Sequence, residues 1–365
     1  MLQLAASGSL ALSLAGAMSA PALAGAATPG RAQPSQTKRK VGIAIGSEQF
    51  APPQVVELGV LAEHAGFDGI WLTDHIQPWQ ANQQHAGQAW VMLSAIGSRT
   101  SRLLLGTGVT TPTFRYHPAV VAQAFATLGA LYPSRVFLGI GAGEALNELA
   151  STGTFAPYRE RAARAEEAVG LIRRLWTGEM AGRSGPYYPT ENTFKLWDLP
   201  PAPVPMYIAG SGPKSATMAG RLGDGWITDG KSALDPAMRA AFTAGVAASG
   251  RDPASIPIRV ESFVVVGGVP EADDAATLWR FSPIGFAAEL YNPDPTSIEQ
   301  QVTSELSAFD VWRNWTVNLD PQDHIDNIRK HWDAGVDEVW VHSGQQDQAR
   351  VMDFYARQVL PHLSR

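Results

Sequence analysis

Asp74 and His75 stand side by side directly after an apolar run at residues 69–73, and Trp79 follows closely. A histidine that is held by a neighbouring carboxylate can act as a general base near neutral pH. The alternative is a structural histidine with satisfied hydrogen bonds, but the place of the pair at the end of an apolar strand favours catalysis. The remaining histidines show no H-E-x-x-H or comparable spacing, so we expect no metal site.

A second acidic group, Glu144, lies in a glycine-rich segment at residues 141–148, after another apolar run at 136–140. If a helix begins here, Glu144 and Asn147 lie one turn apart on a common face, where Glu144 could donate or accept a proton. The alternative is an acid that the helix dipole favours at a helix start. Glu148 fits that alternative better than Glu144 does.

Two further glycine-containing segments also follow apolar runs. Residues 106–112 would let a flat ligand approach the backbone closely, although a tight turn explains this composition equally well. Residues 210–215 would open a helix, whose first N–H groups can bind an anion such as a cofactor phosphate. This second motif is weak by itself.

The elements that must position these residues alternate along the chain. Short apolar runs predict strands at residues 41–45, 69–73, 103–107, 136–140, 204–209, 226–228, 258–266 and 336–341. Helical spacing or capping signals predict helices at 53–65, 118–131, 159–176, 213–221 and 350–360. This alternation is typical of an α/β fold, and we predict a (β/α)8 TIM barrel, in which residues just past the strand ends face the active site.

Two segments interrupt the alternation. Residues 178–203 are rich in glycine and proline, and residues 270–320 contain helical stretches without an obvious strand, which predicts a helical insertion that caps the barrel. The alternative fold is a doubly wound sheet. It is disfavoured because Glu144 stands where the dinucleotide fingerprint needs its third glycine, and a carboxylate there would repel a pyrophosphate.

Composition narrows the functional class. The chain has 365 residues, of which 45% are hydrophobic and 17% charged, and its formal net charge is −6. No basic tract runs through it, which argues against nucleic acid as a partner. Cysteine is absent, so disulfides, thiol catalysis and cysteine-ligated metals are excluded. No apolar run after the first 40 residues is long enough to span a membrane.

The first 40 residues differ from the rest. Residues 2–26 carry no charge, are rich in Leu, Ala, Ser and Gly, and end in small residues that fit a cleavage site; a polar linker follows. We therefore expect residues 1–40 to be a signal peptide with its linker, before a barrel domain at 41–365, and we expect an exported protein of the cell envelope or a periplasm-like space. No basic residue precedes the apolar stretch, so a truncated twin-arginine signal, an uncleaved anchor or a disordered tail in a cytoplasmic protein are alternatives.

Several stretches together resemble the luciferase-like superfamily, and within it the dehydrogenases that use the deazaflavin coenzyme F420. The stretches are residues 71–75, 103–107, 113–118, 123–127 and 136–148. The similarity runs from about residue 41 to the end of the chain. It is strongest to the F420-dependent glucose-6-phosphate dehydrogenases and to their exported relatives that act on hydroxymycolic acids. The resemblance implies a homodimer and hydride transfer from an alcohol carbon to oxidised F420.

The resemblance also implies roles for individual residues. His75 would take the hydroxyl proton, Glu144 would exchange the proton at the deazaflavin ring, and Trp79 would stabilise the transition state. A non-proline cis peptide is expected at Gly108-Val109. The residues expected to line the cofactor are Asp74, Gly108, Val109, Thr111, Gly143, Asn147, Gly212 and Ser215.

Departures from the family concern the substrate. Lys231 and Arg280 match one lysine and the arginine that bind a sugar phosphate, but Glu261 stands near the remaining lysine position. A carboxylate there would repel a phosphate, so we predict that glucose 6-phosphate is not the substrate. Aromatic residues of the insertion suit an apolar or lipid-like hydroxy substrate, or else simply pack the cap: Trp279, Phe281, Phe286, Tyr291, Trp312 and Trp315.

The leading hypothesis is therefore an F420-dependent dehydrogenase that oxidises a hydroxylated envelope lipid, such as a hydroxymycolic acid, to the ketone. The same site could run in reverse as a reductase. The alternatives are an FMN-dependent luciferase-like monooxygenase, an F420-dependent sugar-phosphate dehydrogenase, and a non-catalytic barrel that binds a cofactor or lipid. Intact His75 and Glu144 disfavour the last of these.

Overall fold

The structure is a computed structural model that describes residues 39–182, 185–283 and 291–364. The expected signal peptide and linker lie outside the described residues except for their last two positions, and so does Phe286. Within these three ranges, no helix has both the length and the apolar character needed to cross a bilayer.

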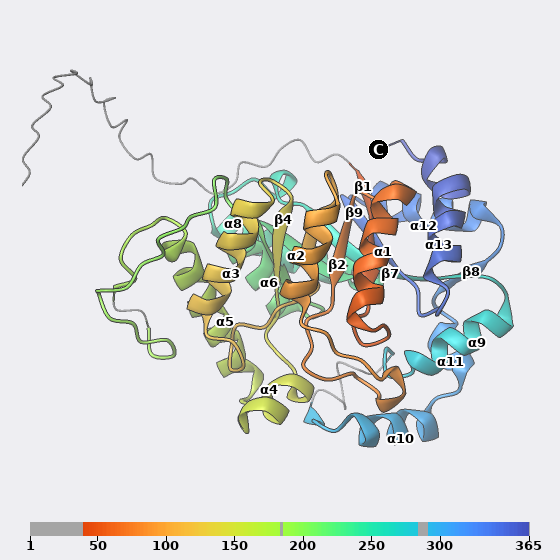
Figure 1. The fold of residues 1–365 in the computed structure, drawn as a ribbon, viewed down its shortest axis with the longest axis horizontal. Coiled ribbons are helices and arrows are strands. Elements are labelled where there is room, and N and C mark those ends of the chain that lie inside the picture. The colour runs from red at the N-terminus through yellow and green to blue at the C-terminus, as the bar shows by residue number, and fades with distance from the viewer. Residues whose placement is uncertain (1–38, 183–184, 284–290, 365) are drawn as a thin grey trace, which may run out of the picture.

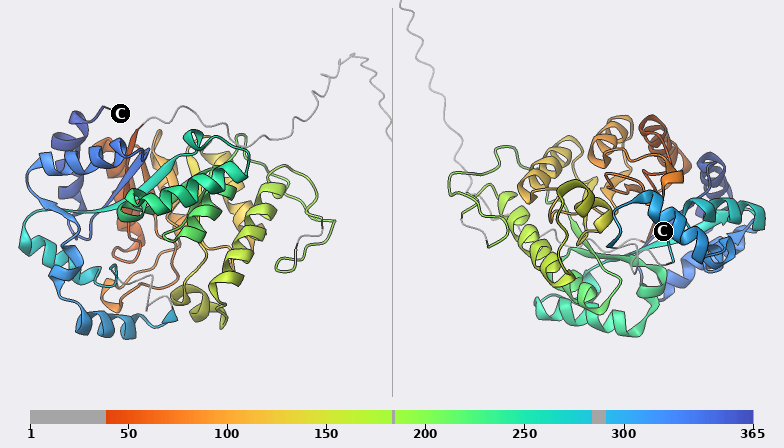
Figure 2. Two further views of the ribbon diagram at one scale, coloured as in Figure 1. Left: turned by 180° about the vertical axis from the view of Figure 1, so that it is seen from behind. Right: turned by 90° about the horizontal axis from the view of Figure 1, so that it is seen from below.

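Parallel strands close into a barrel (Figures 1 and 2). The pairing order is β6-β5-β4-β3-β2-β1-β9-β7, and β7 pairs with β6 to complete the circle. This closure confirms the predicted (β/α)8 barrel and excludes the doubly wound sheet, which has open edges. The strands are β1 Lys40–Ile45, β2 Gly69–Leu72, β3 Leu104–Thr107, β4 Val136–Ile140, β5 Met206–Ala209, β6 Gly225–Asp229, β7 Ile258–Val266 and β9 Glu338–His342.

Helices surround the barrel, as the view along its axis shows (Figure 2). Several begin with proline in their first turn, where the missing N–H has no intrahelical partner to lose. The helix α1 ends at Gly66, whose φ of 91° lies in the left-handed region that favours glycine. The helices are α1 Pro52–Ala65, α2 Ala89–Arg99, α3 Pro118–Leu131, α4 Ala145–Thr152, α5 Tyr158–Leu175, α6 Pro213–Leu222, α7 Gly230–Leu234, α8 Pro236–Ala248, α12 Pro321–Asp333 and α13 Gln348–Phe354.

The insertion between β7 and β9 forms a cap (Figure 1). Its described helices are α9 Val269–Leu278, α10 Pro295–Glu305 and α11 Ala308–Trp312. The insertion is mostly helical, as predicted, but it also contains one short strand that the sequence did not make obvious: β8 Thr316–Asn318 pairs in parallel with the end of β7. This strand has only three residues, too few to produce a periodic pattern that the sequence could reveal.

Charged and aromatic side chains fill the barrel interior below the strand ends. The guanidinium of Arg259 lies 4.0 Å from the ring centre of Phe137, 3.9 Å from Tyr207 and 4.6 Å from Trp340. Its Nη2 is 2.6 Å from an oxygen of Glu338, and both side chains are almost fully buried. Alternate residues of a strand face the same side. Glu261, two positions after Arg259 in β7, and His342, two positions after Trp340 in β9, therefore also face the interior.

Candidate active site

Two carboxylates hold His75 at the mouth of the barrel, where the strands end. Its Nδ1 lies 2.6 Å from Oε1 of Glu48, and its Nε2 lies 3.4 Å from Oε2 of Glu144. Glu48 comes from the loop after β1, and Glu144 precedes the first residue of α4, after β4. The side chain of Glu48 is fully buried, whereas that of Glu144 is 20% exposed. His75 thus connects an interior carboxylate to one that solvent can reach.

The ends of two neighbouring strands fix the position of Glu48. The hydroxyl of Thr73, directly after β2, donates to Oε2 of Glu48 at 2.7 Å. The backbone N–H of Ser47 donates to the same threonine oxygen at 2.8 Å, and the hydroxyl of Ser47 donates to the carbonyl of Thr73 at 2.9 Å. These bonds orient Glu48 towards Nδ1, so Nε2 is the ring nitrogen that a reactant can approach.

The two carboxylates control the charge of His75. Burial alone lowers the pKa of His75, but the charges and hydrogen bonds of Glu48 and Glu144 outweigh it and raise the pKa to about 10. Burial raises the pKa of Glu48, but the charge of His75 and the hydrogen bonds from His75 and Thr73 produce a net lowering. At neutral pH the site therefore favours an imidazolium held by an ionised Glu48, the form that a histidine base adopts after accepting a proton.

Asp74 does not orient His75, although it is its neighbour in sequence. Its carboxylate accepts hydrogen bonds from the hydroxyls of Thr110 at 2.6 Å and Tyr116 at 3.2 Å. The guanidinium of Arg115 lies 3.7 Å from the same carboxylate and donates to the carbonyl of Asp74 at 2.7 Å. Glu48, and not Asp74, is the carboxylate that holds Nδ1 of His75, and Asp74 ties the end of β2 to the loop after β3.

Trp79 forms one wall beside His75. The two rings meet edge to face, with centres 5.4 Å apart, and the other side of Trp79 stacks on Phe281 of the cap at 4.5 Å. The N–H of Phe281 donates to the side chain of Gln80 at 3.0 Å, which fixes the cap against this loop. The structure thus brings Trp79 to His75, as the sequence predicted, and adds Phe281.

The loops after β3 and β4 pack closely against one another. The expected non-proline cis peptide is present at Gly108-Val109. A Cβ atom at Gly141 would lie 2.6 Å from the side chain of Val109, and one at Gly143, where φ is 89°, would lie 2.8 Å from the side chain of Thr111. Only glycine permits this approach of backbone to side chain.

Asn147 links the same loops to the proton-handling group. Its side-chain oxygen accepts from the N–H of Ile76 at 2.9 Å, and its amide donates to Oε2 of Glu144 at 3.2 Å. Glu144 and Asn147 are therefore in contact, although Glu144 is the extended residue before α4 and not part of the helix face that was predicted. Asn147 connects the residue after His75 to Glu144. A flat ligand that rested on Val109 and Gly143 would lie beside both groups.

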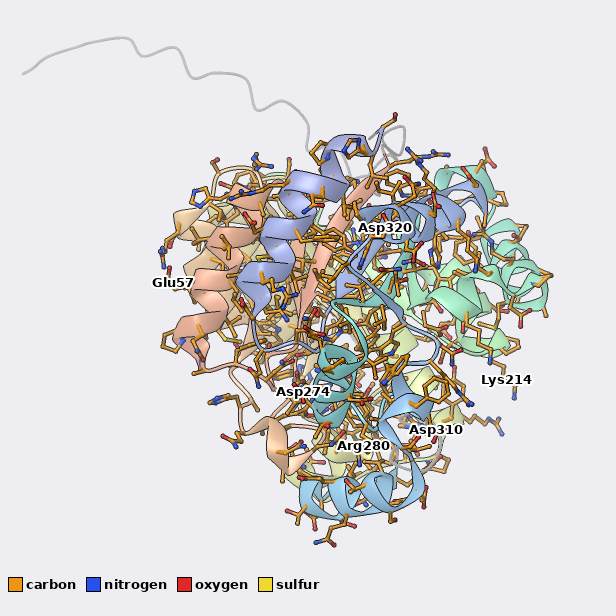
Figure 3. All side chains as sticks on the ribbon, turned by 90° about the vertical axis from the view of Figure 1, so that its right-hand side faces the viewer. Glu57, Lys214, Asp274, Arg280, Asp310 and Asp320 are labelled. Atoms are coloured by element: carbon orange, nitrogen blue, oxygen red, sulfur yellow. The ribbon has the colours of Figure 1, made fainter. Side chains whose placement is uncertain are left out.

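The start of α6 could hold the anionic part of such a ligand. Gly212 precedes the helix, and its N–H donates to the hydroxyl of Ser215 at 3.1 Å, while that hydroxyl donates back to the carbonyl of Gly212 at 2.9 Å. Lys214 is exposed in the first turn (Figure 3). Helix N–H groups, the helix dipole and a lysine suit a phosphate-bearing tail, so these residues fit a flat cofactor with a phosphate.

The predicted substrate cations come from different elements of the fold. Lys231 is exposed on α7, after β6, and Arg280 lies between α9 and α10 in the cap (Figure 3). Arg280 is partly buried and adjoins Phe281, which brings it near Trp79. Among the described residues, no hydrogen bond or ion pair joins either cation to His75 or Glu144.

Glu48 is the active-site residue that the sequence interpretation missed. It comes three residues after the end of β1, and no recognised motif surrounds it. The rule that selected His75, a titratable residue shortly after a strand, would also have selected Glu48. In the three described ranges, no group of three or more histidine, aspartate or glutamate side chains is arranged to hold a metal ion.

Comparison with known proteins gives consistent relatives. The profile of the luciferase-like monooxygenase family matches residues 28–338. The F420-dependent hydroxymycolic acid dehydrogenase of Mycobacterium tuberculosis (strain ATCC 25618 / H37Rv) is 46% identical over 330 residues, which cover 90% of each chain. The F420-dependent glucose-6-phosphate dehydrogenase 2 of Rhodococcus jostii (strain RHA1) is 41% identical, over 89% of this chain and 97% of the relative.

Solved structures support the same family. An F420-dependent secondary alcohol dehydrogenase, in complex with an F420-acetone adduct, superposes with a TM-score of 0.84 at 28% identity, and the match covers 90% of this chain and all of the other. The coenzyme F420-dependent tetrahydromethanopterin reductase of Methanopyrus kandleri has a TM-score of 0.72 at 19% identity, over 90% of this chain and all of the reductase, and this likeness supports the fold alone.

Proposed function

The chain belongs to the luciferase-like monooxygenase family, and from that premise we propose that it is an F420-dependent dehydrogenase that oxidises a secondary alcohol to a ketone. The observation that carries this proposal is His75 between Glu48 and Glu144 at the barrel mouth. Relatives that use F420 and act on alcohols support both the cofactor and the reaction class.

His75 serves as the base for the alcohol hydroxyl. The imidazolium is the favoured form of the free site at neutral pH, so the base is the minor, neutral form of His75. In that form Glu48 stays ionised and holds Nδ1–H, the unprotonated Nε2 receives the hydroxyl proton, and both carboxylates stabilise the resulting imidazolium. F420, when bound, supplies the hydride acceptor. Glu144, partly exposed and 3.4 Å from Nε2, exchanges protons with the reacting groups and with water. Trp79 excludes water beside His75.

The loops after β3 and β4 and the start of α6 hold the cofactor. The surface proposed for the flat ring of the cofactor is narrow and made of small and apolar groups: Val109, Thr111 and Gly143. Asn147 holds Glu144 beside this surface through a hydrogen bond. Gly212 and Ser215 at the start of α6 bind the phosphate-bearing part. Asp74 contributes to this surface indirectly, because the hydrogen bond that it accepts from the hydroxyl of Thr110 holds the loop that carries Val109 and Thr111.

A hydroxylated lipid of the cell envelope is the substrate class we propose. The relative from M. tuberculosis is a hydroxymycolic acid dehydrogenase, and Glu261 opposes the phosphate of a sugar phosphate. The described cap aromatics give this only partial support, because Trp279 and Phe281 are buried in the packing of the cap, whereas Tyr291 is 58% exposed.

The test is spectroscopic. Purified protein is mixed with oxidised F420 and a series of secondary alcohols that runs from small alcohols to hydroxymycolates, and loss of the deazaflavin absorbance is followed. We expect bleaching with wild type and none with H75A, while H75A still binds F420. Tight binding of FMN but not F420, or no bleaching with any secondary alcohol, would contradict the proposal.

We further propose that residues 1–40 direct the protein out of the cytoplasm and that the barrel works as a homodimer. The uncharged, small-residue-rich stretch at 2–26 supports export. Fractionation of cells that express the full chain, with and without residues 1–38, would test export. Sedimentation of the purified barrel would test the dimer, and a single species with the mass of one chain would contradict it.

A further inference from the structure

Glu261 and His342 face the inside of the barrel one step above its charged interior. Along β7, Arg259 faces inward, so Glu261 and Phe263 do too; along β9, Glu338 and Trp340 face inward, and so does His342. The strand register places Phe263 beside His342 and Glu261 beside Trp340. His342 is the last residue of β9, and Glu261 lies level with Asp229, the last residue of β6. Both titratable side chains therefore lie at the mouth of the barrel that also holds His75.

These two side chains form a close pair. Nδ1 of His342 lies 2.7 Å from Oε1 of Glu261. The imidazole stacks on Phe263 at 4.4 Å and meets Trp279 edge to face at 4.2 Å, which fixes the ring. The side chain of His342 is 2% exposed, and its Nε2 has no hydrogen-bond partner among the described residues. His342 is thus held in place to donate from Nδ1.

Glu261, in contrast, is open towards the mouth. Its side chain is 33% exposed, and among the described residues neither a lysine nor an arginine forms an ion pair with it. Arg259, two positions earlier on the same strand, is already engaged by Glu338. Glu261 therefore presents an oxygen that can accept a hydrogen bond, and among the described residues its negative charge is not neutralised by an ion pair with a lysine or an arginine.

We propose that Glu261, positioned by His342, selects the substrate: it accepts a hydrogen bond from an uncharged O–H or N–H group near the oxidised carbon and excludes alcohols that carry an anion there. This inference rests on the proposed alcohol dehydrogenase function. Glu261 contacts the substrate, and His342 acts through Glu261. An anion in contact with Glu261 would meet a carboxylate that no ion pair with a lysine or an arginine neutralises, and that carboxylate offers it no hydrogen-bond donor.

A pair of isosteric inhibitors tests this selection. Cyclohexanecarboxamide and cyclohexanecarboxylate have the same shape, but only the amide is neutral and offers N–H donors. Their inhibition constants are measured against F420-dependent oxidation of cyclohexanol, and their binding is measured separately as a shift in thermal unfolding of the F420-loaded protein. The thermal measurement needs no turnover, so failure of this inference is distinguished from failure of the proposed function.

In wild type we expect the amide to bind at least about tenfold more tightly than the carboxylate. E261Q, which keeps the shape and removes the charge, should bring this ratio close to one. The exposed carboxylate of Glu179 provides the control, and E179Q should keep the wild-type ratio. Equal binding of the two inhibitors to wild type, or an unchanged ratio in E261Q, would overturn the proposal.

Variants of His342 separate positioning from packing. H342F keeps a ring against Phe263 and Trp279 but removes the donor, so the inhibitor ratio should fall, and the KM for an alcohol with a second hydroxyl should rise more than kcat falls. H342N restores a donor near the place of Nδ1 and should recover part of the ratio. If H342F and H342N behave alike, His342 has no positioning role and that part of the proposal is wrong.

Discussion

Replacing Glu48 by glutamine tests the electrostatic account of the site most directly. E48Q keeps an oxygen that can accept from Nδ1 of His75 but removes the charge that holds the imidazolium. The interval between the ordinary histidine pKa of 6.5 and about 10 corresponds to roughly 5 kcal/mol of stabilisation of the charged form. Because loss of one partner from a buried ion pair costs about 3–5 kcal/mol, we expect E48Q to lower the free energy of unfolding by about that amount at pH 6 to 7.

The pH dependence of this loss has a defined sign. The pKa of His75 is raised on folding, so its contribution is fully present below pH 6.5 and is lost as the pH rises through about 10. The pKa of Glu48 is lowered, so its contribution is present above its ordinary value of 4.5 and is lost at lower pH. The difference in the free energy of unfolding between wild type and E48Q should therefore be largest between about pH 4.5 and 6.5. Above pH 6.5 it should shrink by up to about 1.4 kcal/mol per pH unit, until the pH reaches about 10.

Urea unfolding of wild type and E48Q at pH 6, 8 and 10 measures this difference, and E179Q provides the control for a lost surface carboxylate. NMR titration of the His75 ring follows the pKa itself, which should fall by several pH units in E48Q. A wild-type His75 that titrates near 6.5, or a stability difference that stays constant from pH 6 to 10, would refute the reasoning.

Three further substitutions follow from the same geometry. Because Glu144 also raises the pKa of His75, E144Q should shift the rising limb of the pH profile of kcat/KM to lower pH and reduce kcat by about tenfold or more. W79A, which removes the ring between His75 and Phe281, should lower the free energy of unfolding by about 3 kcal/mol in urea titrations and reduce kcat. R259M leaves Glu338 buried without its partner and should cost about 3–5 kcal/mol in the same assay, and R259M/E338Q should recover part of that loss.

The barrel could be predicted from the sequence because most of its strands are short, largely apolar runs with both faces buried, although β7 and β9 also carry charged residues. Apolar runs and capping signals placed most of the predicted elements within two residues of their observed ends, whereas the helices α2, α7, α8 and α12 were not predicted. β8 could not be found in this way, since three partly exposed residues depend on pairing with β7 rather than on their own pattern. The closing helix, expected to reach residue 360, ends as an α-helix at Phe354 and continues as a π-turn, Tyr355–Val359, which spacing alone does not distinguish.

Site residues could be predicted where their place after a strand was enough to identify them. Pairings between side chains could not be predicted where they depend on contacts between segments that are far apart in the sequence. The ends of β2 and β4 indicated His75 and Glu144. The place of Glu48 after β1 would have marked it as a candidate, but its pairing with His75 depends on the contact between the loop after β1 and Thr73 at the end of β2. The partner of Glu261, His342, lies 81 positions away in sequence, and only the register of β7 with β9 brings the two together.

The sealed barrel interior constrains how protons leave the enzyme. Arg259, Glu338 and the rings around them block water from the amino-terminal end of the barrel, and Glu48 is itself buried. In the proposed reaction, Glu144, which is 20% exposed and 3.4 Å from Nε2, would be the relay between His75 and bulk water. A bound lipid chain that covered Glu144 would block this proton route. His75 would then lose its proton to water only as the ketone departs. Long-chain substrates should therefore show a solvent isotope effect tied to product release, whereas small alcohols, which leave this route open, should not.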